Sequence, residues 1–177
     1  MAKTIWITGL AGAGKSSIAR TLYTHMKEER IPVVLIDGDN IREIFGNDLG
    51  HDIDDRIRNA YRIANMCHFL NEQGIDVVCA TMSLYPEVWD WCKEHIENYI
   101  RVYIKVNKEF LVGRDQKQLY SKAAKGTGKN VVGMDLPFHE PNCADLIIEN
   151  SVSSESFSEE KSQTILNYLK ENYCETW

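Results

Sequence analysis

Short apolar runs rich in β-branched residues alternate along the chain with longer stretches of helical pattern. Runs of about 4–8 such residues, bounded by turn signals, predict strands. The expected strands are Thr4–Thr8, Val33–Asp37, Asp76–Thr81, Arg101–Val106 and Asp145–Ile148. The expected helices are Ser16–Glu29, Asp54–Gln73, Pro86–Asn98, Glu109–Arg114 and Glu159–Tyr173. This strand–helix alternation predicts an α/β fold with a parallel five-stranded sheet flanked by helices.

One long segment, Gln116–Asn142, interrupts the alternation. It begins with short helical character and continues with several turn-forming residues, namely Gly126, Gly128, Gly133, Pro137 and Pro141. Such a glycine-punctuated segment predicts a mobile lid in the C-terminal half, with a plain connecting loop as the alternative. No repeat, linker or second domain is evident in the sequence, so we expect residues 1–177 to form one domain.

The composition limits the cellular compartments and the classes of partner that we expect for this protein. The chain is 44% hydrophobic and 26% charged, and its net charge of −6 provides no basic field for a nucleic-acid backbone. No apolar stretch approaches the ~20 residues that cross a membrane, and the first strand begins too early for a signal peptide to precede it. The five cysteines are scattered and lack a C-x-x-C pair, which argues against disulfides or a zinc site. We therefore expect a cytoplasmic protein with no nucleic-acid or membrane partner.

The segment Gly9–Ser16 is a complete G-x-x-x-x-G-K-S phosphate loop between a predicted strand and a predicted helix. Glycines let the backbone curl around a phosphate with its N–H groups inward, and the helix N-terminus adds positive partial charge. Lys15 would reach the β- and γ-phosphates of ATP, and the Ser16 hydroxyl would bind Mg²⁺. A glycine-rich turn that serves only close packing is the weaker alternative. The residues expected to bind ATP here are Gly9, Gly12, Ala13, Gly14, Lys15, Ser16 and Ser17.

A second candidate site follows the strand Val33–Asp37, where the chain continues Gly38-Asp39-Asn40-Ile41-Arg42. A carboxylate there could orient Mg²⁺ or accept a hydroxyl proton, and Arg42 could hold the phosphate of an acceptor. We assign Asp37 to the metal and Asp39 to the acceptor hydroxyl. The alternative is a turn whose aspartate caps the next helix.

These two motifs and four more resemble those of the adenylylsulfate (APS) kinase family, over about residues 3–150. The four are Asp48-Leu49-Gly50, Asp55-Arg56-x-x-Asn59-x-x-Arg62, Arg114-Asp115-x-Lys117-x-Leu119-Tyr120-x-Lys122-Ala123 and Gly133-x-Asp135. Members of this family are P-loop enzymes that transfer the γ-phosphate of ATP to the ribose 3′-hydroxyl of adenosine 5′-phosphosulfate. Adenylate and shikimate kinases share the phosphate loop but lack two of these motifs, the one that runs from Asp37 to Arg42 and the one that begins at Arg114.

The resemblance implies roles for several residues. It implies that Arg114 stacks on the ATP adenine and that Lys117 reaches the anionic end group of the acceptor. It places Lys15, Asp39 and Lys117 in catalysis, with phosphoryl transfer depending mainly on alignment and charge neutralisation. The acceptor-binding set that it implies is Asp39, Arg42, His51, Arg56, Asn59, Ser83, Lys117 and Val131. Solvated or helix-capping charged side chains remain the alternative for these polar positions.

The departures from the family pattern all fall on the acceptor side. His51 and Val131 stand where APS kinases have two phenylalanines that clamp the adenine of APS. Ser83 is retained, but the two arginines that follow it in the family are absent from residues 84–89. Stacking of a base on an aromatic ring contributes roughly 1–3 kcal/mol, so the loss of both walls should weaken binding of a purine acceptor.

This pattern leaves three hypotheses. The first is a divergent branch that phosphorylates cytidine diphosphoramidate, a pyrimidine analogue of APS, in bacterial capsule phosphoramidate synthesis. The second is an APS kinase that makes PAPS for sulfate assimilation and has an altered clamp. The third is a catalytically inactive nucleotide-binding regulator. The resemblance further implies a homodimer whose ligands are ATP, Mg²⁺ and a small nucleotide acceptor.

Overall fold

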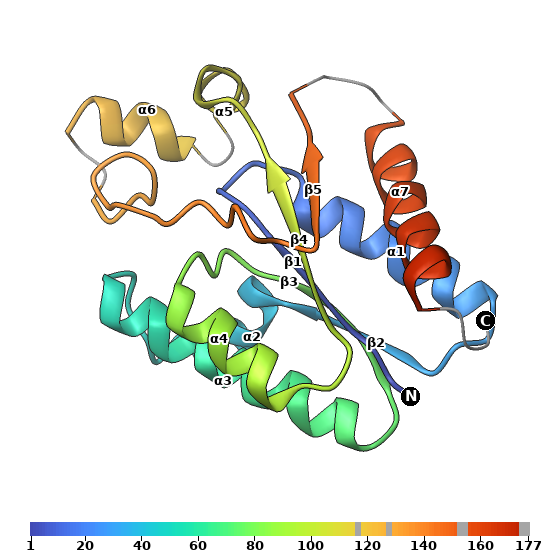
Figure 1. Cartoon of the computed structure of the whole chain (residues 1–177). Helices are drawn as coiled ribbons and strands as arrows, with labels where there is room; N and C mark the ends of the chain where they lie inside the picture. Colours follow the sequence, from blue (N-terminus) through green and yellow to red (C-terminus); the bar gives the residue numbers. More distant parts are fainter. Residues whose placement is uncertain (116–117, 127–128, 152–155, 174–177) are drawn as a thin grey trace.

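Five parallel strands form a single sheet in the computed structural model, which describes residues 1–115, 118–126, 129–151 and 156–173 (Figure 1). The strands are β1 (Thr4–Thr8), β2 (Val33–Asp37), β3 (Asp76–Ala80), β4 (Tyr99–Lys105) and β5 (Leu146–Glu149). Their order across the sheet is β2-β3-β1-β4-β5, with every neighbouring pair parallel. The predicted fold class is confirmed, and the strand ends shift by no more than two residues.

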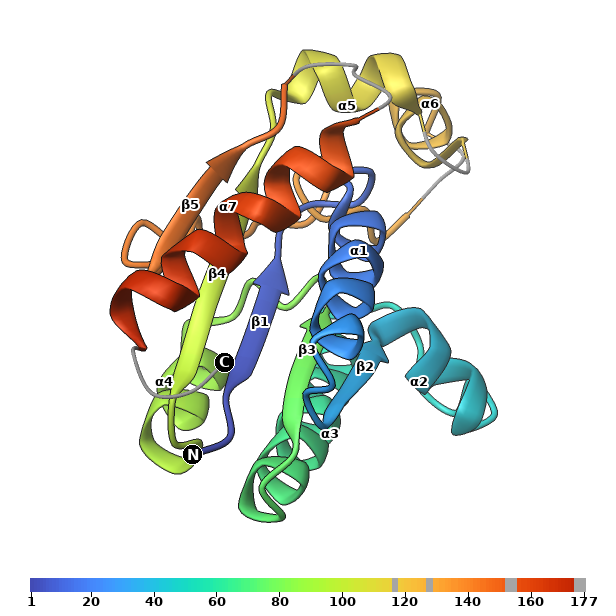
Figure 2. The ribbon, with the colours of Figure 1, turned by 90° about the vertical axis from the view of Figure 1, so that its right-hand side faces the viewer.

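Helices cover both faces of the sheet, as Figures 1 and 2 show. On one face lie α1 (Lys15–Glu28) and α7 (Phe157–Asn172), and on the other α3 (Ile53–Glu72) and α4 (Pro86–His95). All five residues of β1 are buried, and they alternate between the two layers. Ile5 and Ile7 pack in the cluster with α1 and α7, whereas Trp6 packs in the cluster with α3 and α4. The central strand is therefore apolar on both faces, as a covered parallel sheet requires.

Two helices differ from the sequence-based expectation. The helix α2 (Gly38–Ile44) was not among the expected helices, because seven residues are too few for a clear apolar periodicity, although the capping alternative for this motif anticipated a helix here. Asp37 caps it, its carboxylate accepting a hydrogen bond from the Asp39 N–H at 3.0 Å. The helix α4 ends at His95 rather than Asn98, since the backbone of Ile96 is extended.

Two short helices, α5 (Lys108–Arg114) and α6 (Leu119–Ala124), lie beyond the carboxyl ends of the strands (Figure 1). The predicted lid segment contributes Tyr120, Val131 and Val132 to a third apolar cluster beneath them. These side chains are buried, so the described part of the segment is packed against the body of the protein. Its movement as a lid stays a prediction. No helix in the described ranges is long and apolar enough to cross a membrane.

Candidate active site

A cavity of about 790 Å³ lies beyond the carboxyl ends of β1, β2 and β3, between the phosphate loop, α2 and α3. This is where parallel α/β sheets bind ligands, and its volume suits a nucleotide. Many of the predicted site residues line it, from both candidate sites. They are Gly12, Gly14, Lys15, Ser16, Ser17, Asp37, Asp39, Arg42, His51, Arg56, Asn59 and Arg114. The structure thus brings the phosphate loop and five of the eight predicted acceptor residues, Asp39, Arg42, His51, Arg56 and Asn59, into one cavity.

The phosphate loop is held by side chains that bond to its carbonyl groups. Four consecutive carbonyl oxygens, those of residues 10–13, each accept one such hydrogen bond. The bonds run from Lys15 Nζ to Leu10 (2.8 Å), Tyr120 OH to Ala11 (2.8 Å), Arg114 Nη1 to Gly12 (3.3 Å) and Asn150 Nδ2 to Ala13 (2.9 Å). They occupy oxygen atoms that would repel a phosphate, and they fix the course of the loop.

Two of these donors, Tyr120 and Asn150, were not predicted as site residues. They lie more than 100 residues from the loop in sequence, and only the fold brings them to it. The only sequence signal was the family motif that contains Tyr120. No pattern in the sequence singled out Asn150, which follows β5 and is buried.

Two glycines of the loop are required by close packing. Gly9 has φ +150°, and a Cβ there would lie 2.6 Å from the Ile104 carbonyl oxygen. Gly14 has φ +92°, and its Cβ would lie 2.8 Å from the ring of Phe157 and 3.0 Å from Asn150 Nδ2. A larger residue at Gly9 would therefore need a shift of the backbone, and one at Gly14 would have to displace the Phe157 and Asn150 side chains while adopting a strained positive φ.

Lys15 has an unusual electrostatic environment. Removal from water lowers the pKa of its ammonium group to about 8, although the carboxylates of Asp39 and Asp37 favour the charged form. A bound polyphosphate would raise the pKa again, because a nearby anion stabilises the protonated lysine. The cavity is therefore suited to a strongly anionic ligand at this end.

Arg114, which donates to the Gly12 carbonyl of the phosphate loop, lies close to two aromatic rings. Its guanidinium carbon is 4.5 Å from the ring centroid of Phe110 and 5.8 Å from that of Phe157. Phe157 lines the cavity and was not predicted as a site residue. A flat ring system can stack on such a guanidinium and on an aromatic face.

The arginines on the acceptor side bond to backbone carbonyl groups. Arg42 Nη1 donates to the carbonyls of Leu49 (3.1 Å) and Gly50 (3.0 Å). Arg56 donates through Nε to the carbonyl of His51 (2.7 Å) and through Nη2 to that of Asn130 (2.9 Å). An arginine carries five N–H donors, so each side chain keeps donors for an anion in the cavity.

The remaining predicted acceptor residues are placed differently. His51 lines the cavity, and partial burial together with the charges of Arg42 and Arg56 lowers its pKa, which favours a neutral imidazole. Asn59 is buried, and its Oδ1 atom has no hydrogen-bond partner among the described residues.

Several predicted residues are not in the cavity lining. Val131 is 3% exposed and packs in the third apolar cluster. Ser83 is buried behind the cavity, where its carbonyl group accepts bonds from Thr8 and Trp89. Gly9 and Ala13 belong to the backbone of the phosphate loop but do not line the cavity. Lys117 lies outside the described residues.

A parallel sheet of this order, with a phosphate loop joining β1 to α1, is the fold of a P-loop NTPase. The chain belongs to the adenylylsulfate kinase family, since the family model for adenylylsulphate kinase matches residues 1–149. Enzymes of this family use ATP as the phosphate donor, and the protein is an ATP-dependent phosphotransferase.

Two curated relatives have different acceptors in their names. A cytidine diphosphoramidate kinase from Campylobacter jejuni subsp. jejuni is 40% identical over 93% of this chain and 95% of its own length. An adenylyl-sulfate kinase from Staphylococcus carnosus is 34% identical over 94% of this chain and 83% of its own. Among solved structures, the Mycobacterium tuberculosis APS kinase in complex with AMPPNP and APS superposes with a TM-score of 0.86 at 29% identity. That match covers 96% of this chain and 98% of the other.

Proposed function

We propose that this enzyme transfers the γ-phosphate of ATP to the ribose 3′-hydroxyl of a cytidine nucleotide with a diphosphate-like 5′ end. Cytidine diphosphoramidate, used in bacterial capsule phosphoramidate synthesis, is the acceptor that we favour. The observation that carries this proposal is the placement of the two altered clamp positions. His51 lines the cavity, whereas Val131 is packed away from it, so no pair of aromatic walls encloses a purine at these positions. A smaller base loses less from the missing wall.

On the donor side, Lys15 would stabilise the charge on the transferring phosphoryl group, and Arg114 would stack on adenine. Mg²⁺, which neutralises phosphate charge, would be held by the Ser16 hydroxyl and the Asp37 carboxylate. Both residues line the cavity, and Asp37 uses one oxygen as a helix cap, which leaves the other available. No group of three or more His, Cys, Asp or Glu side chains that could hold a metal ion occurs within the described ranges. Mg²⁺ is commonly held by one or two protein ligands together with waters and phosphates.

On the acceptor side, Asp39 would orient the 3′-hydroxyl and accept its proton as the oxygen attacks the γ-phosphorus. A bond then forms between O3′ and the γ-phosphorus while the bond from that phosphorus to the bridging oxygen breaks, with ADP leaving. Arg42 and Arg56 would hold the anionic end of the acceptor, and Asn59 would hydrogen-bond to it. We assign Lys117 to the same anionic end group on the family motif alone. Such positioning aligns the reacting atoms, which is the main task in phosphoryl transfer.

The alternative is APS kinase activity, which is supported by the names of the Staphylococcus carnosus and Mycobacterium tuberculosis relatives. Retention of Lys15, Ser16 and Asp39 in the cavity favours an enzyme over an inactive regulator.

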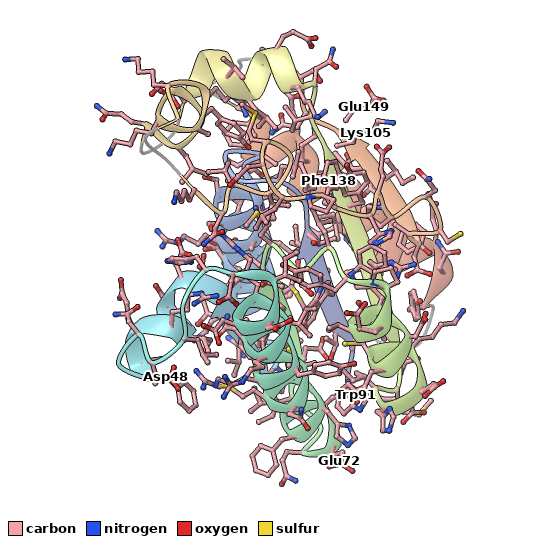
Figure 3. All side chains as sticks on the ribbon, turned by 90° about the vertical axis from the view of Figure 1, so that its left-hand side faces the viewer. Asp48, Glu72, Trp91, Lys105, Phe138 and Glu149 are labelled. Carbon is pink, nitrogen blue, oxygen red and sulfur yellow. The ribbon has the colours of Figure 1, made fainter. Side chains whose placement is uncertain are left out.

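We also propose a homodimer in the cytoplasm. The half-buried Trp91, which lies between α3 and α4 in Figure 3, stacks on His95 and meets Tyr61 and His68 edge-on, so it belongs to the packing between these two helices. The four described cysteines, Cys67, Cys79, Cys92 and Cys143, are free thiols.

The proposal is tested by offering APS and cytidine diphosphoramidate in separate assays with ATP and Mg²⁺. We expect turnover of the cytidine acceptor, with the new phosphate on its 3′-oxygen as located by phosphorus–proton coupling. Turnover of APS alone would assign the enzyme to the alternative. If neither acceptor is phosphorylated at the expense of ATP, both acceptor assignments are wrong.

A further inference from the structure

The segment of residues 46–52, here called the acceptor loop, joins α2 to α3 and carries His51 to the cavity. Most of its residues are exposed, and Leu49 is buried. Gly46 and Asn47 have positive φ angles of 69° and 52°, so the chain turns sharply as it leaves α2. An exposed loop of this kind keeps one conformation only if specific contacts hold it.

The inner side of the acceptor loop orients the two arginines of the cavity. Its carbonyl groups at residues 49–51 accept the hydrogen bonds from Arg42 and from Arg56 Nε. These bonds determine the direction in which the remaining N–H donors of each guanidinium point. A displacement of the loop would therefore displace both groups that we propose to bind the anionic end of the acceptor.

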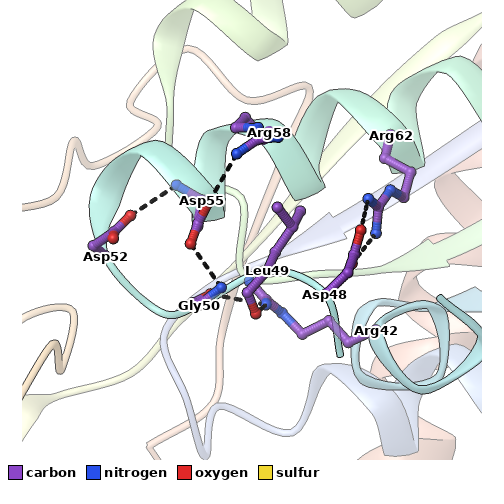
Figure 4. A network of polar contacts seen from close by, with 8 residues as sticks. All are labelled: Arg42, Asp48, Leu49, Gly50, Asp52, Asp55, Arg58 and Arg62. Atoms are coloured by element: carbon purple, nitrogen blue, oxygen red, sulfur yellow. Dashed lines mark hydrogen bonds and ion pairs between the residues drawn. The ribbon is translucent and has the colours of Figure 1, made fainter. Parts of the chain in front are cut away.

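The outer side of the acceptor loop is held by α3, as Figure 4 shows. Arg62 makes a two-pronged ion pair with Asp48, with Nη1 to Oδ1 at 2.9 Å and Nη2 to Oδ2 at 2.7 Å. The guanidinium of Arg62 also lies 4.2 Å from the ring centroid of Phe45. A second contact between α3 and the acceptor loop is made by the Asp55 carboxylate, which accepts a hydrogen bond from the Gly50 N–H at 2.7 Å.

Arg62 and Asp48 do not line the cavity, so any influence on the acceptor passes through the loop. The paired, planar geometry fixes both the distance and the orientation of Asp48 relative to α3, which a single lysine bond would not do. The Arg62 side chain is 21% exposed and that of Asp48 48% exposed, so the pair lies at the surface, where solvent screening keeps its contribution modest.

We propose that Asp48 and Arg62 form a positioning pair that sets acceptor affinity by holding the acceptor loop, and through it Arg42, Arg56 and His51, in the binding geometry. This proposal depends on the proposed function only for the choice of acceptor in the kinetic test; the contacts that hold the loop do not depend on it. The pair contributes nothing to ATP binding, since the phosphate loop has its own supports.

The test is Arg62→Gln, with Arg58→Gln as the matched control. Arg58 lies one turn earlier on α3, carries the same charge and is 71% exposed. It pairs with Asp55 through Oδ1, so its replacement leaves the bond from the Gly50 N–H to Asp55 Oδ2 in place and does not touch the bidentate pair of Arg62 with Asp48. For Arg62→Gln we expect the KM of the acceptor to rise about two- to fivefold, as suits an ion pair near the surface, with the KM of ATP unchanged. Arg62→Lys should fall between this variant and the wild type, and Arg58→Gln should match the wild type. An unchanged acceptor KM, or equal rises in both KM values with a lower Tm, would overturn the proposal.

A second measurement does not depend on the acceptor. Amide hydrogen exchange over residues 46–52 should quicken about two- to fivefold in Arg62→Gln and stay at the wild-type rate in Arg58→Gln. If the wild type prefers APS, the proposed function is wrong, and the KM measurements that test the positioning pair are made with APS instead. If the wild type phosphorylates neither acceptor, the positioning pair is tested by amide exchange alone. Equal exchange rates over residues 46–52 in Arg62→Gln and Arg58→Gln would then refute it.

Discussion

The two halves of the cavity are held together in different ways. On the donor side, side chains from distant segments bond to the carbonyls of residues 10–13, and two glycines leave no room for a Cβ. On the acceptor side, Arg42 and Arg56 are held chiefly by carbonyl groups of an exposed loop. Most changes in the donor half therefore disturb buried contacts, whereas an exposed residue on the acceptor side, such as His51, can change at little cost in stability. The specificity for the acceptor can therefore change while the residues that hold the phosphate loop are kept.

The largest effect is expected at the centre of the donor half. Lys15→Ala should lower kcat by about 10²–10³-fold, because Lys15 stabilises charge on the transferring phosphoryl group. The change should leave the Tm within a few degrees of wild type, which circular dichroism would verify. Turnover within a few-fold of wild type would remove this loop from the catalytic site.

Asp39 lies where the two halves meet, and its substitution tests whether the acceptor hydroxyl is activated there. Asp39→Asn should lower kcat by about 10²-fold, within the range of a general base, and change the KM of ATP little. Steady-state kinetics with ATP and the acceptor varied in turn would separate these effects. A loss confined to ATP affinity would make Asp39 a donor-side residue.

The acceptor half is tested by restoring the family clamp. His51→Phe with Val131→Phe should shift relative kcat/KM toward APS by about tenfold, since base stacking contributes roughly 1–3 kcal/mol. Because Val131 is buried, the larger ring can strain the third apolar cluster by about 1–3 kcal/mol. The single change His51→Phe avoids this strain and should carry most of the shift. An acceptor preference unaltered in both variants would show that these positions do not read the base.

The smallest effect is expected from a support of the phosphate loop. Tyr120→Phe removes the hydrogen bond to the Ala11 carbonyl, and a bond of this kind contributes about 0.5–1.5 kcal/mol. The KM of ATP should rise about two- to tenfold, and that of the acceptor should stay constant. A change in the acceptor KM of equal size would mean that the two halves are not independently supported.

Much of the fold was predictable because its signals are local. The strand β1 and the phosphate loop are contiguous in sequence, and Lys15 and Ser16 line the cavity as expected. The helix α2 escaped prediction because its cap and its seven residues resemble a turn. Tyr120, Asn150 and Phe157 escaped because their contacts join segments far apart in the chain.

On the predicted acceptor side, the sequence could name several residues that line the cavity but not their geometry. The sequence indicated Arg42, Arg56 and His51, and all three line the cavity. It could not indicate that Val131 is buried, because Val131 reaches the third cluster through a turn that depends on Asp135. The carboxylate of Asp135 accepts bonds from the N–H groups of Asn130 and Val131, both at 2.6 Å. Side-chain direction in such a turn follows from these contacts and not from a periodic pattern.

The most direct test of the account is a competition between the two acceptors in one reaction. Equal concentrations of APS and cytidine diphosphoramidate are offered with limiting ATP and Mg²⁺, and the 3′-phosphorylated products are quantified by mass spectrometry. Their initial ratio equals the ratio of kcat/KM for the two acceptors. The account predicts an excess of the cytidine product. An excess of the adenosine product would contradict it and identify an APS kinase with an altered clamp.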